Sequence, residues 1–193
     1  DLVSTAWGRA RRWWGETREF RAYRMDRAAF AAAPSDARIH RNDLTHLLAF
    51  TPSERWHRRR EFLGAAMERL EAGQAVYTAC TEGRLAHFGW LALRQTQARL
   101  TEVDYVMPLP PGSATMYDFY THPEDRGQGL YRASLRRMLG DAFADQATES
   151  AWIFVLADNV ASRRAIEATG FRHVGTSRLT RRFGRQSTVY EPE

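Results

Sequence analysis

A strand, a glycine-rich turn, an amphipathic helix and a second strand follow one another between residues 115 and 157. The second strand, residues 150–157 (SAWIFVLA), is an unbroken apolar run, which is typical of a strand covered on both faces. The helix carries apolar residues at i, i+3, i+4, i+7 and i+8 from Leu135 to Phe143. The sequence Arg126-Gly127-Gln128-Gly129 stands shortly before it. This order predicts an α+β fold built around a strand–loop–helix–strand unit.

The remaining segments supply further strands and helices on both sides of this unit. We expect an edge strand over 19–26, then a mostly helical stretch whose last helix begins near Pro52 and ends at Gly73. A meander follows, with strands over 75–80, 84–94 and 100–106 and a loop over 107–114. A short helix over 159–169 and two closing strands, 171–183 and 187–192, complete a single domain over residues 19–193. The basic and aromatic residues 1–18 are predicted to form an N-terminal arm.

The composition narrows the class of protein. At 44% hydrophobic residues the 193-residue chain can fill a core, and no apolar run approaches the ~20 residues that span a bilayer. Cys80 is the only cysteine, which excludes a disulfide framework and a cysteine metal site, and we expect a cytoplasmic protein. Because the chain begins at Asp1, we expect the native start, with any targeting signal there, to have been removed.

The basic residues are of one kind, since all 28 are arginine. The absence of lysine excludes Schiff-base chemistry and the phosphate-binding loop that ends in Gly-Lys-Ser/Thr. The arginines are dispersed among 23 acidic residues, so the net charge of +5 predicts a solvated surface and no nucleic-acid partner.

The glycines before the central helix have two interpretations. They supply the positive φ of a tight turn, or they let a ligand approach the backbone closely. A helix N-terminus behind such a turn presents unpaired N–H groups that hold phosphate or pyrophosphate. The dinucleotide-binding fingerprint is matched only in its first Gly-x-Gly, and the N-terminal half lacks the strand–helix alternation of that fold.

The order of meander, strand, Arg-Gly-x-Gly, helix, apolar strand, Asn-x-x-Ser, short helix and Gly-Phe resembles the GNAT family of acyl-CoA-dependent N-acetyltransferases. The most specific parts are residues 121–130 and 159–171. In that family the loop follows Gln/Arg-x-x-Gly-x-Gly/Ala; Arg126 and Gly129 match it, and Tyr131 departs from it. The resemblance implies a mixed, mostly antiparallel central sheet with a splayed parallel strand pair, flanked by helices.

The resemblance also implies an activity: transfer of an acetyl group from acetyl-CoA to a primary amine of a small molecule, by direct attack. Neither a metal nor an acyl-enzyme is needed. The backbone amides near the end of the strand would polarise the thioester carbonyl. The residues that the resemblance assigns to coenzyme A are Tyr120, Thr121, Arg126, Gly127, Gln128, Gly129, Leu130, Tyr131 and Asn159.

The catalytic groups are less closely defined. Asp118, which period-two alternation groups with Tyr120, is the first candidate for the base; its alternative role is a structural acid bonded to an arginine. Tyr117, Glu102 or a water chain are the other options for the base. His122 is expected to be a turn residue.

The residue that often acts as general acid in that family is absent from this sequence. The family often has a tyrosine four residues before the glycine of the Gly-Phe pair, and here Ile166 stands there. Either Tyr131, Ser162 or water replaces it, or the thiolate leaves unassisted. Asn159 either contacts the pantetheine or caps the helix that follows it.

The acceptor is expected beside the early helices, which carry Trp56, His57 and the arginines 55 and 58–60. If some of these arginines face the site, they favour an anionic acceptor, such as an acidic amino acid or a nucleotide-linked amino sugar. The sequence leaves a homodimer open. It also leaves open an aminoacyl-tRNA-dependent transferase of the same fold, or a regulatory domain that binds acyl-CoA without catalysis.

Overall fold

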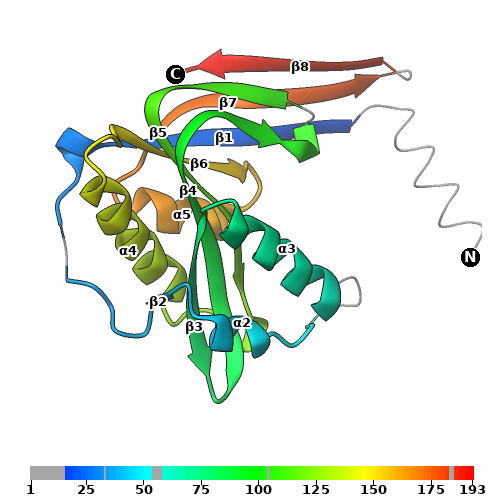
Figure 1. Cartoon of the computed structure of the whole chain (residues 1–193). Helices are drawn as coiled ribbons and strands as arrows, with labels where there is room; N and C mark the ends of the chain where they lie inside the picture. Colours follow the sequence, from blue (N-terminus) through cyan, green and yellow to red (C-terminus); the bar gives the residue numbers. More distant parts are fainter. Residues whose placement is uncertain (1–15, 33, 54–57, 104, 183–184) are drawn as a thin grey trace, which may run out of the picture.

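The computed structural model describes residues 16–32, 34–53, 58–103, 105–182 and 185–193 (Figure 1). Within them an eight-stranded sheet has the order β2-β3-β4-β5-β6-β1-β7-β8. Its strands are β1 Glu16–Asp26, β2 His40–Arg41, β3 Ala75–Thr81, β4 Arg84–Leu100, β5 Tyr105–Thr121, β6 Ser150–Leu156, β7 Arg172–Arg182 and β8 Arg185–Pro192. The helices are α2 Leu44–Leu48, α3 Arg59–Glu71, α4 Leu130–Ala144 and α5 Val160–Glu167, with short 3-10 turns at Arg27–Ala29, Thr101–Val103 and Pro123–Asp125.

The sheet is antiparallel except at its centre, where β5 and β6 run parallel. This parallel pairing joins Ser113–Met116 to Ser150–Ile153 and extends no further. Beyond it, β6 continues to pair with β1, and β5 continues beside β4. The two central strands therefore diverge toward their carboxyl ends, which confirms the mixed sheet with a splayed parallel pair.

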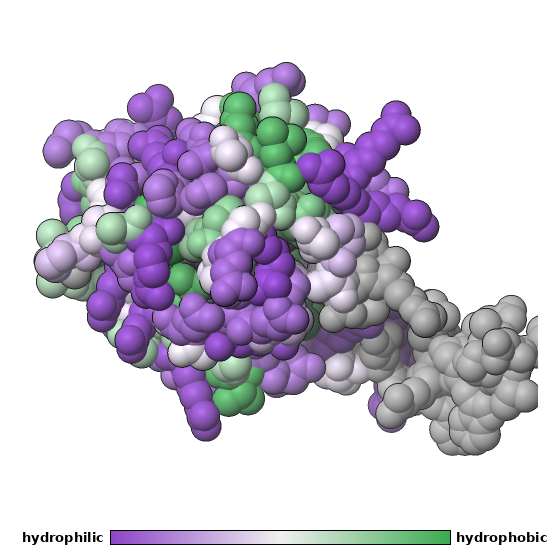
Figure 2. Space-filling view, turned by 90° about the horizontal axis from the view of Figure 1, so that it is seen from below, coloured by the Kyte–Doolittle hydropathy of each residue, from purple (hydrophilic) through white to green (hydrophobic). Residues whose placement is uncertain are grey.

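Helices cover both faces of the sheet. On β3, Tyr77 and Ala79 pack in one core cluster with Leu135 and Met138 of α4, whereas Val76 packs in another with Leu47 of α2 and Ala66 of α3. Because alternate residues of a strand point to opposite faces, α4 and α2–α3 lie on opposite sides of the sheet (Figure 1). The face shown in Figure 2 is mainly hydrophilic, with apolar groups in small patches.

Three of the predicted elements differ from those observed. β1 is not an edge strand: it lies between β6 and β7, and its Tyr23 is fully buried. Residues 107–114, predicted as a loop, belong to β5, because Ala98–Leu100 at the end of β4 pair with Tyr105–Met107. In the stretch 27–50, predicted as mostly helical, the described residues form only a short 3-10 turn, the two-residue β2 and the five-residue α2.

Two boundaries differ as well. The helix predicted from Pro52 begins at Arg59, and residues 54–57, including Trp56 and His57, lie outside the described residues. Of the predicted arm, residues 1–15 lie outside the description, and residues 16–18 belong to β1. None of the described helices has the length and apolar character needed to cross a membrane.

Candidate functional site

A cleft of about 750 Å³ opens where β5 and β6 diverge. One wall is the end of β5, residues 119–121, and the other is α5 with Asn159 in front of it. The glycine loop and the first turn of α4 close its end. The predicted coenzyme residues therefore come together around one cavity: Tyr120, Thr121, Arg126, Gly127, Gly129, Leu130, Tyr131 and Asn159 all line it, and so does Ser162.

The loop glycines have the positive φ of a tight turn, and their surroundings leave room for a ligand to approach. Gly127 and Gly129 have φ values of 80° and 76°, in the left-handed region that disfavours other residues. A Cβ placed on either would meet nothing within 4 Å, so the loop faces open space rather than packed side chains. Gly129 is the N-cap of α4 and supplies no side-chain cap, which leaves the first N–H groups of the helix available to an anion.

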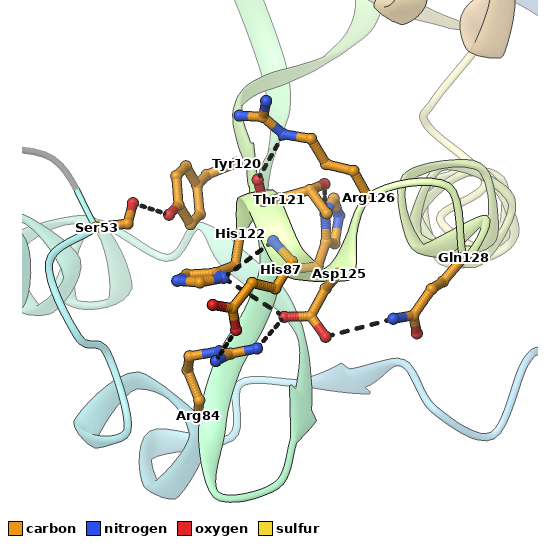
Figure 3. Close-up of polar contacts among 10 residues, drawn as sticks. Ser53, Arg84, His87, Tyr120, Thr121, His122, Asp125, Arg126 and Gln128 are labelled. Carbon is orange, nitrogen blue, oxygen red and sulfur yellow. Dashed lines mark hydrogen bonds and ion pairs between the residues drawn. The ribbon is translucent and has the colours of Figure 1, made fainter.

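A buried carboxylate holds this loop in place. Asp125 is 2% exposed and accepts hydrogen bonds from Arg84 Nη2 at 2.9 Å and from Gln128 Nε2 at 3.5 Å (Figure 3). His122 Nδ1 accepts from the Glu124 N–H at 3.4 Å, so His122 serves the turn as expected. Gln128, predicted to contact the coenzyme, has its side chain directed to Asp125.

Three arginines give the cleft positive charge. Arg126 was predicted, and its Nε donates to the Thr121 carbonyl at 3.4 Å (Figure 3). Arg132 in the first turn of α4 also lines the cleft, as does Arg164 of α5. No pattern in the sequence indicates Arg164, because the side of α5 that meets the cleft depends on how the helix packs.

A tyrosine hydroxyl stands at the wall of the cleft. Ser162 Oγ donates to Tyr131 Oη at 3.1 Å, which leaves the Tyr131 proton free to donate elsewhere. Burial raises the pKa of Tyr131 to about 12, so the phenol is protonated at neutral pH. Asn159 Oδ1 accepts from the Ser162 N–H at 3.1 Å and caps α5. Ile166 is fully buried in the core.

His87 is a residue of this region that the sequence reasoning missed. It is fully buried on β4, and its Nδ1 lies 2.8 Å from Thr121 Oγ1 at the edge of the cleft (Figure 3). Burial lowers the pKa of His87 to about 3, so the imidazole is neutral at physiological pH. No sequence signal pointed to it, because the register of β4 against β5 brings the two residues together.

β5 carries a bulge directly before the cleft. Tyr117 pairs with Trp90 and Tyr120 with Phe88, so β5 has one residue more than β4 over this interval. Asp118 adopts a positive φ of 51° there. Period-two alternation therefore fails across the bulge. On β4, Gly89 makes room for the Phe119 ring, which lies 2.3 Å from where a Cβ would stand.

A second cavity, of about 360 Å³, lies on the α3 side of the sheet and meets the cleft at the bulge. Phe119 and Tyr120 line both. With these two, six of the twelve residues that line the second cavity are aromatic, and we call it the aromatic cavity. The other ten residues are four aromatic residues, two alanines, two arginines and two acids: Phe50, Phe62, Phe88, Trp90, Ala65, Ala66, Arg58, Arg69, Glu61 and Asp118. The Tyr120 hydroxyl bonds Ser53 Oγ in the segment before α3 (Figure 3). Two molecules, one bound in each cavity, would thus meet at the same short stretch of β5.

Asp118, the predicted base, is ion-paired with Arg69 of α3. The Arg69 guanidinium also lies over the rings of Trp90 and Tyr117, at 5.1 and 5.2 Å. Tyr117 donates to Gln74 Oε1, and burial raises its pKa. The side chain of Glu102, another candidate, lies outside the described residues.

Residues 18–172 match the family model for the acetyltransferase (GNAT) domain. The chain belongs to this family. A search of curated proteins finds no match. Among solved structures, the GNAT fold recurs in an acetyltransferase from Colwellia psychrerythraea, with a TM-score of 0.59 and 15% identity over 93% of this chain and 57% of that one.

Two further GNAT structures are similar at comparable identity. A putative acetyltransferase from Novosphingobium aromaticivorans has a TM-score of 0.54 and 18% identity, over 92% of this chain and 66% of its own. The aminoglycoside acetyltransferase AAC(6')-Iy, in complex with a bisubstrate analogue, has a TM-score of 0.51 and 17% identity, over 70% of this chain and 90% of its own. The chain spans less than two thirds of the length of the Colwellia and Novosphingobium proteins.

Proposed function

We propose that this GNAT protein transfers an acetyl group from acetyl-CoA to the primary amine of a small molecule. The proposal rests on one observation. Two cavities meet at the β-bulge of β5, and Phe119 and Tyr120 line both of them. The cleft receives the coenzyme and the aromatic cavity receives the amine. A protein of similar fold is described in complex with an analogue that joins coenzyme A to acetylneamine, which supports this two-substrate arrangement.

The residues of the cleft fit coenzyme A. Its pyrophosphate would be held by the free N–H groups at the start of α4, with the positive charges of Arg126, Arg132 and Arg164 around it. The pantetheine arm would lie along the edge of β5 that β6 leaves uncovered after Met116. The coenzyme supplies the acetyl group as an activated thioester.

The chain supplies proton transfer and positioning. Asp118 is proposed to accept the proton of the attacking amine, directly or through water, from its place on the bulge beside the aromatic cavity. Tyr131, hydrogen-bonded by Ser162, is proposed to donate a proton to the departing thiolate. Both side chains belong to residues that line one of the two cavities.

The lining of the second cavity favours an acceptor of the amino sugar or amino acid type that also carries an apolar group. Its rings can pack against such a group, and Trp90 contributes a buried Nε1–H that has no hydrogen-bond partner among the described residues. Arg58 can pair with an acceptor carboxylate or phosphate. Cytoplasmic location and oligomeric state stay predictions.

The experiment is a screen for thiol release from acetyl-CoA against amino sugars, amino acids and polyamines, some with aromatic or aliphatic substituents. We expect amine-dependent release, with acetylated product identified by mass spectrometry. Coenzyme A binding, measured by calorimetry on the same preparation, serves as the control. The ion pair that occupies Asp118 favours one alternative, a domain that binds acyl-CoA without catalysis; saturable binding without release from any amine would favour that role.

A further inference from the structure

A polar cluster lies at the start of α2, and none of its members lines either cavity. His40 comes from β2, Asp43 is the N-cap of α2, and His46 lies one turn into that helix. His46 Nε2 is 3.6 Å from Asp43 Oδ2, and His40 Nδ1 is 3.9 Å from the same oxygen. One ligand atom from each residue lies within 4.8 Å of the other two. The segment His40–His46 thus gathers two imidazoles around one carboxylate.

Hydrogen bonds around the cluster orient its histidine and aspartate side chains. The Thr78 hydroxyl donates its single hydrogen to the His40 carbonyl at 3.4 Å. The same hydroxyl lies 3.0 Å from His46 Nδ1, and it accepts from that nitrogen in the tautomer with the proton on Nδ1. His46 Nε2 is then left with a lone pair facing a carboxylate oxygen. Two acceptors in this position repel each other unless a cation lies between them.

Asp43 is oriented in a similar way. Its Oδ1 accepts from the His46 N–H at 3.2 Å as the helix cap, so Oδ2 is the oxygen that faces the two imidazoles. The His46 side chain is 17% exposed and that of His40 is 50% exposed, so the cluster is anchored on one side and open to solvent on the other. A cap and a threonine hydroxyl that orient ligands are the kind of outer contacts that metal sites use.

We propose that His40, Asp43 and His46 bind a divalent transition-metal ion, with zinc as the best match to two imidazoles and one carboxylate. Bonds of about 2.0–2.1 Å in tetrahedral geometry place ligand atoms ~3.3 Å apart. The distances of 3.6 and 3.9 Å to the Asp43 oxygen are about half an ångström longer than this, and the two imidazole nitrogens lie within 4.8 Å of each other. Water completes the coordination on the exposed side.

The metal ties together three elements at one edge of the sheet. His40 belongs to β2, Asp43 and His46 to the start of α2, and Thr78 anchors the group to β3. Phe50, which follows α2, lines the aromatic cavity. The ion therefore braces the segment that carries one wall of that cavity, without touching the reacting groups.

The test is titration of the full chain, with any histidine tag removed, with zinc chloride in a calorimeter and with cobalt(II) in a spectrometer. We expect one equivalent of zinc to bind, and cobalt to give the intense visible bands of tetrahedral coordination. Asp43→Asn keeps a helix cap while removing the charged ligand. It should weaken zinc binding at least tenfold, since loss of even an outer contact costs about 10- to 100-fold.

His40→Ala provides a second variant, because the side chain is half exposed and its removal leaves the fold intact. His173→Ala is the matched control: this histidine pairs with Glu193, outside the cluster, and its loss should leave zinc affinity unchanged. Zinc should raise the melting temperature of the unmodified chain and of His173→Ala only. Absence of stoichiometric binding, or binding equally tight in Asp43→Asn and His40→Ala, would overturn the proposal. Neither result bears on acetyl transfer.

Discussion

Tyr131 occupies the loop position where the GNAT pattern has a small residue, and its surroundings suit a proton donor. Its ring packs edge-on against Phe119, at 4.7 Å between centroids, and its hydroxyl accepts from Ser162. Burial raises its pKa to about 12, so it holds its proton at any pH where the enzyme would work. The ring packing holds the side chain in position, and the hydroxyl is the proposed proton donor.

Tyr131→Phe keeps the ring and removes the hydroxyl. We expect kcat to fall about a hundredfold, the usual contribution of a positioned acid, while KM for acetyl-CoA changes little. Steady-state kinetics with varied acetyl-CoA measure both. Ser162→Ala serves as comparison and should have a smaller effect, since Ser162 only orients the phenol. An unchanged kcat in Tyr131→Phe would mean that the thiolate leaves without this acid.

Variants of Asp118 and of its ion-pair partner Arg69 distinguish a catalytic role of Asp118 from a structural one. Asp118→Asn should lower turnover mostly at low pH, because the amine is then most protonated and most needs a base. Arg69→Gln breaks the same ion pair but leaves the carboxylate. If Asp118 is only structural, both variants will show the pH–rate profile of the unmodified enzyme. Asp118→Asn should alter stability by no more than about 1 kcal/mol, since the Asp118 side chain is 47% exposed.

At the scale of elements, the decisive unit is the turn between β5 and α4. Its glycines hold positive φ, the buried Asp125 fixes its base through Arg84, and the uncapped start of α4 faces the cleft. β6 contributes by turning away from β5 after Ile153. The proposed binding surface for a diphosphate therefore consists mainly of backbone groups.

Gly129→Ala and Gly129→Glu form a matched pair for this turn. Both place an L side chain at a φ of 76°, which costs about 1–2 kcal/mol of stability. Only glutamate adds a negative charge where phosphate would bind. We expect coenzyme A affinity, measured by calorimetry, to be abolished in Gly129→Glu and largely kept in Gly129→Ala, with both chains folded by circular dichroism. Equal affinities in the two variants would refute the loop assignment.

For the whole molecule, the buried His87 links stability to pH. Its pKa of about 3 in the folded chain lies well below the ordinary 6.5, so between these values the unfolded chain binds the extra proton. The stabilisation is complete above about pH 6.5 and is lost as the pH falls toward 3. Between these pH values, each pH unit can change the free energy of unfolding by at most about 1.4 kcal/mol through this one proton.

Urea unfolding at a series of pH values from neutral to about pH 4 measures this dependence. We expect the free energy of unfolding to fall more steeply with acidification in the unmodified chain than in His87→Gln, whatever the absolute stability of the variant. His173→Gln, which removes a mostly buried histidine of β7, is the control. Parallel curves for all three proteins would show that His87 does not titrate between the two states.

Much of the structure of this protein could be predicted from short stretches of its sequence. The apolar run of β6, the periodicity of α4 and the two loop glycines predicted the central unit, because each depends on neighbours within a few positions. The resemblance to the GNAT family that these features supported indicated nine of the sixteen residues that line the cleft. Tertiary pairing decided the rest. β1 lies inside the sheet, His87 meets Thr121, and Arg164 reaches the cleft only because strands and helices distant in sequence pack together. The bulge that joins the two cavities is likewise a matter of register between β4 and β5, which no local pattern encodes.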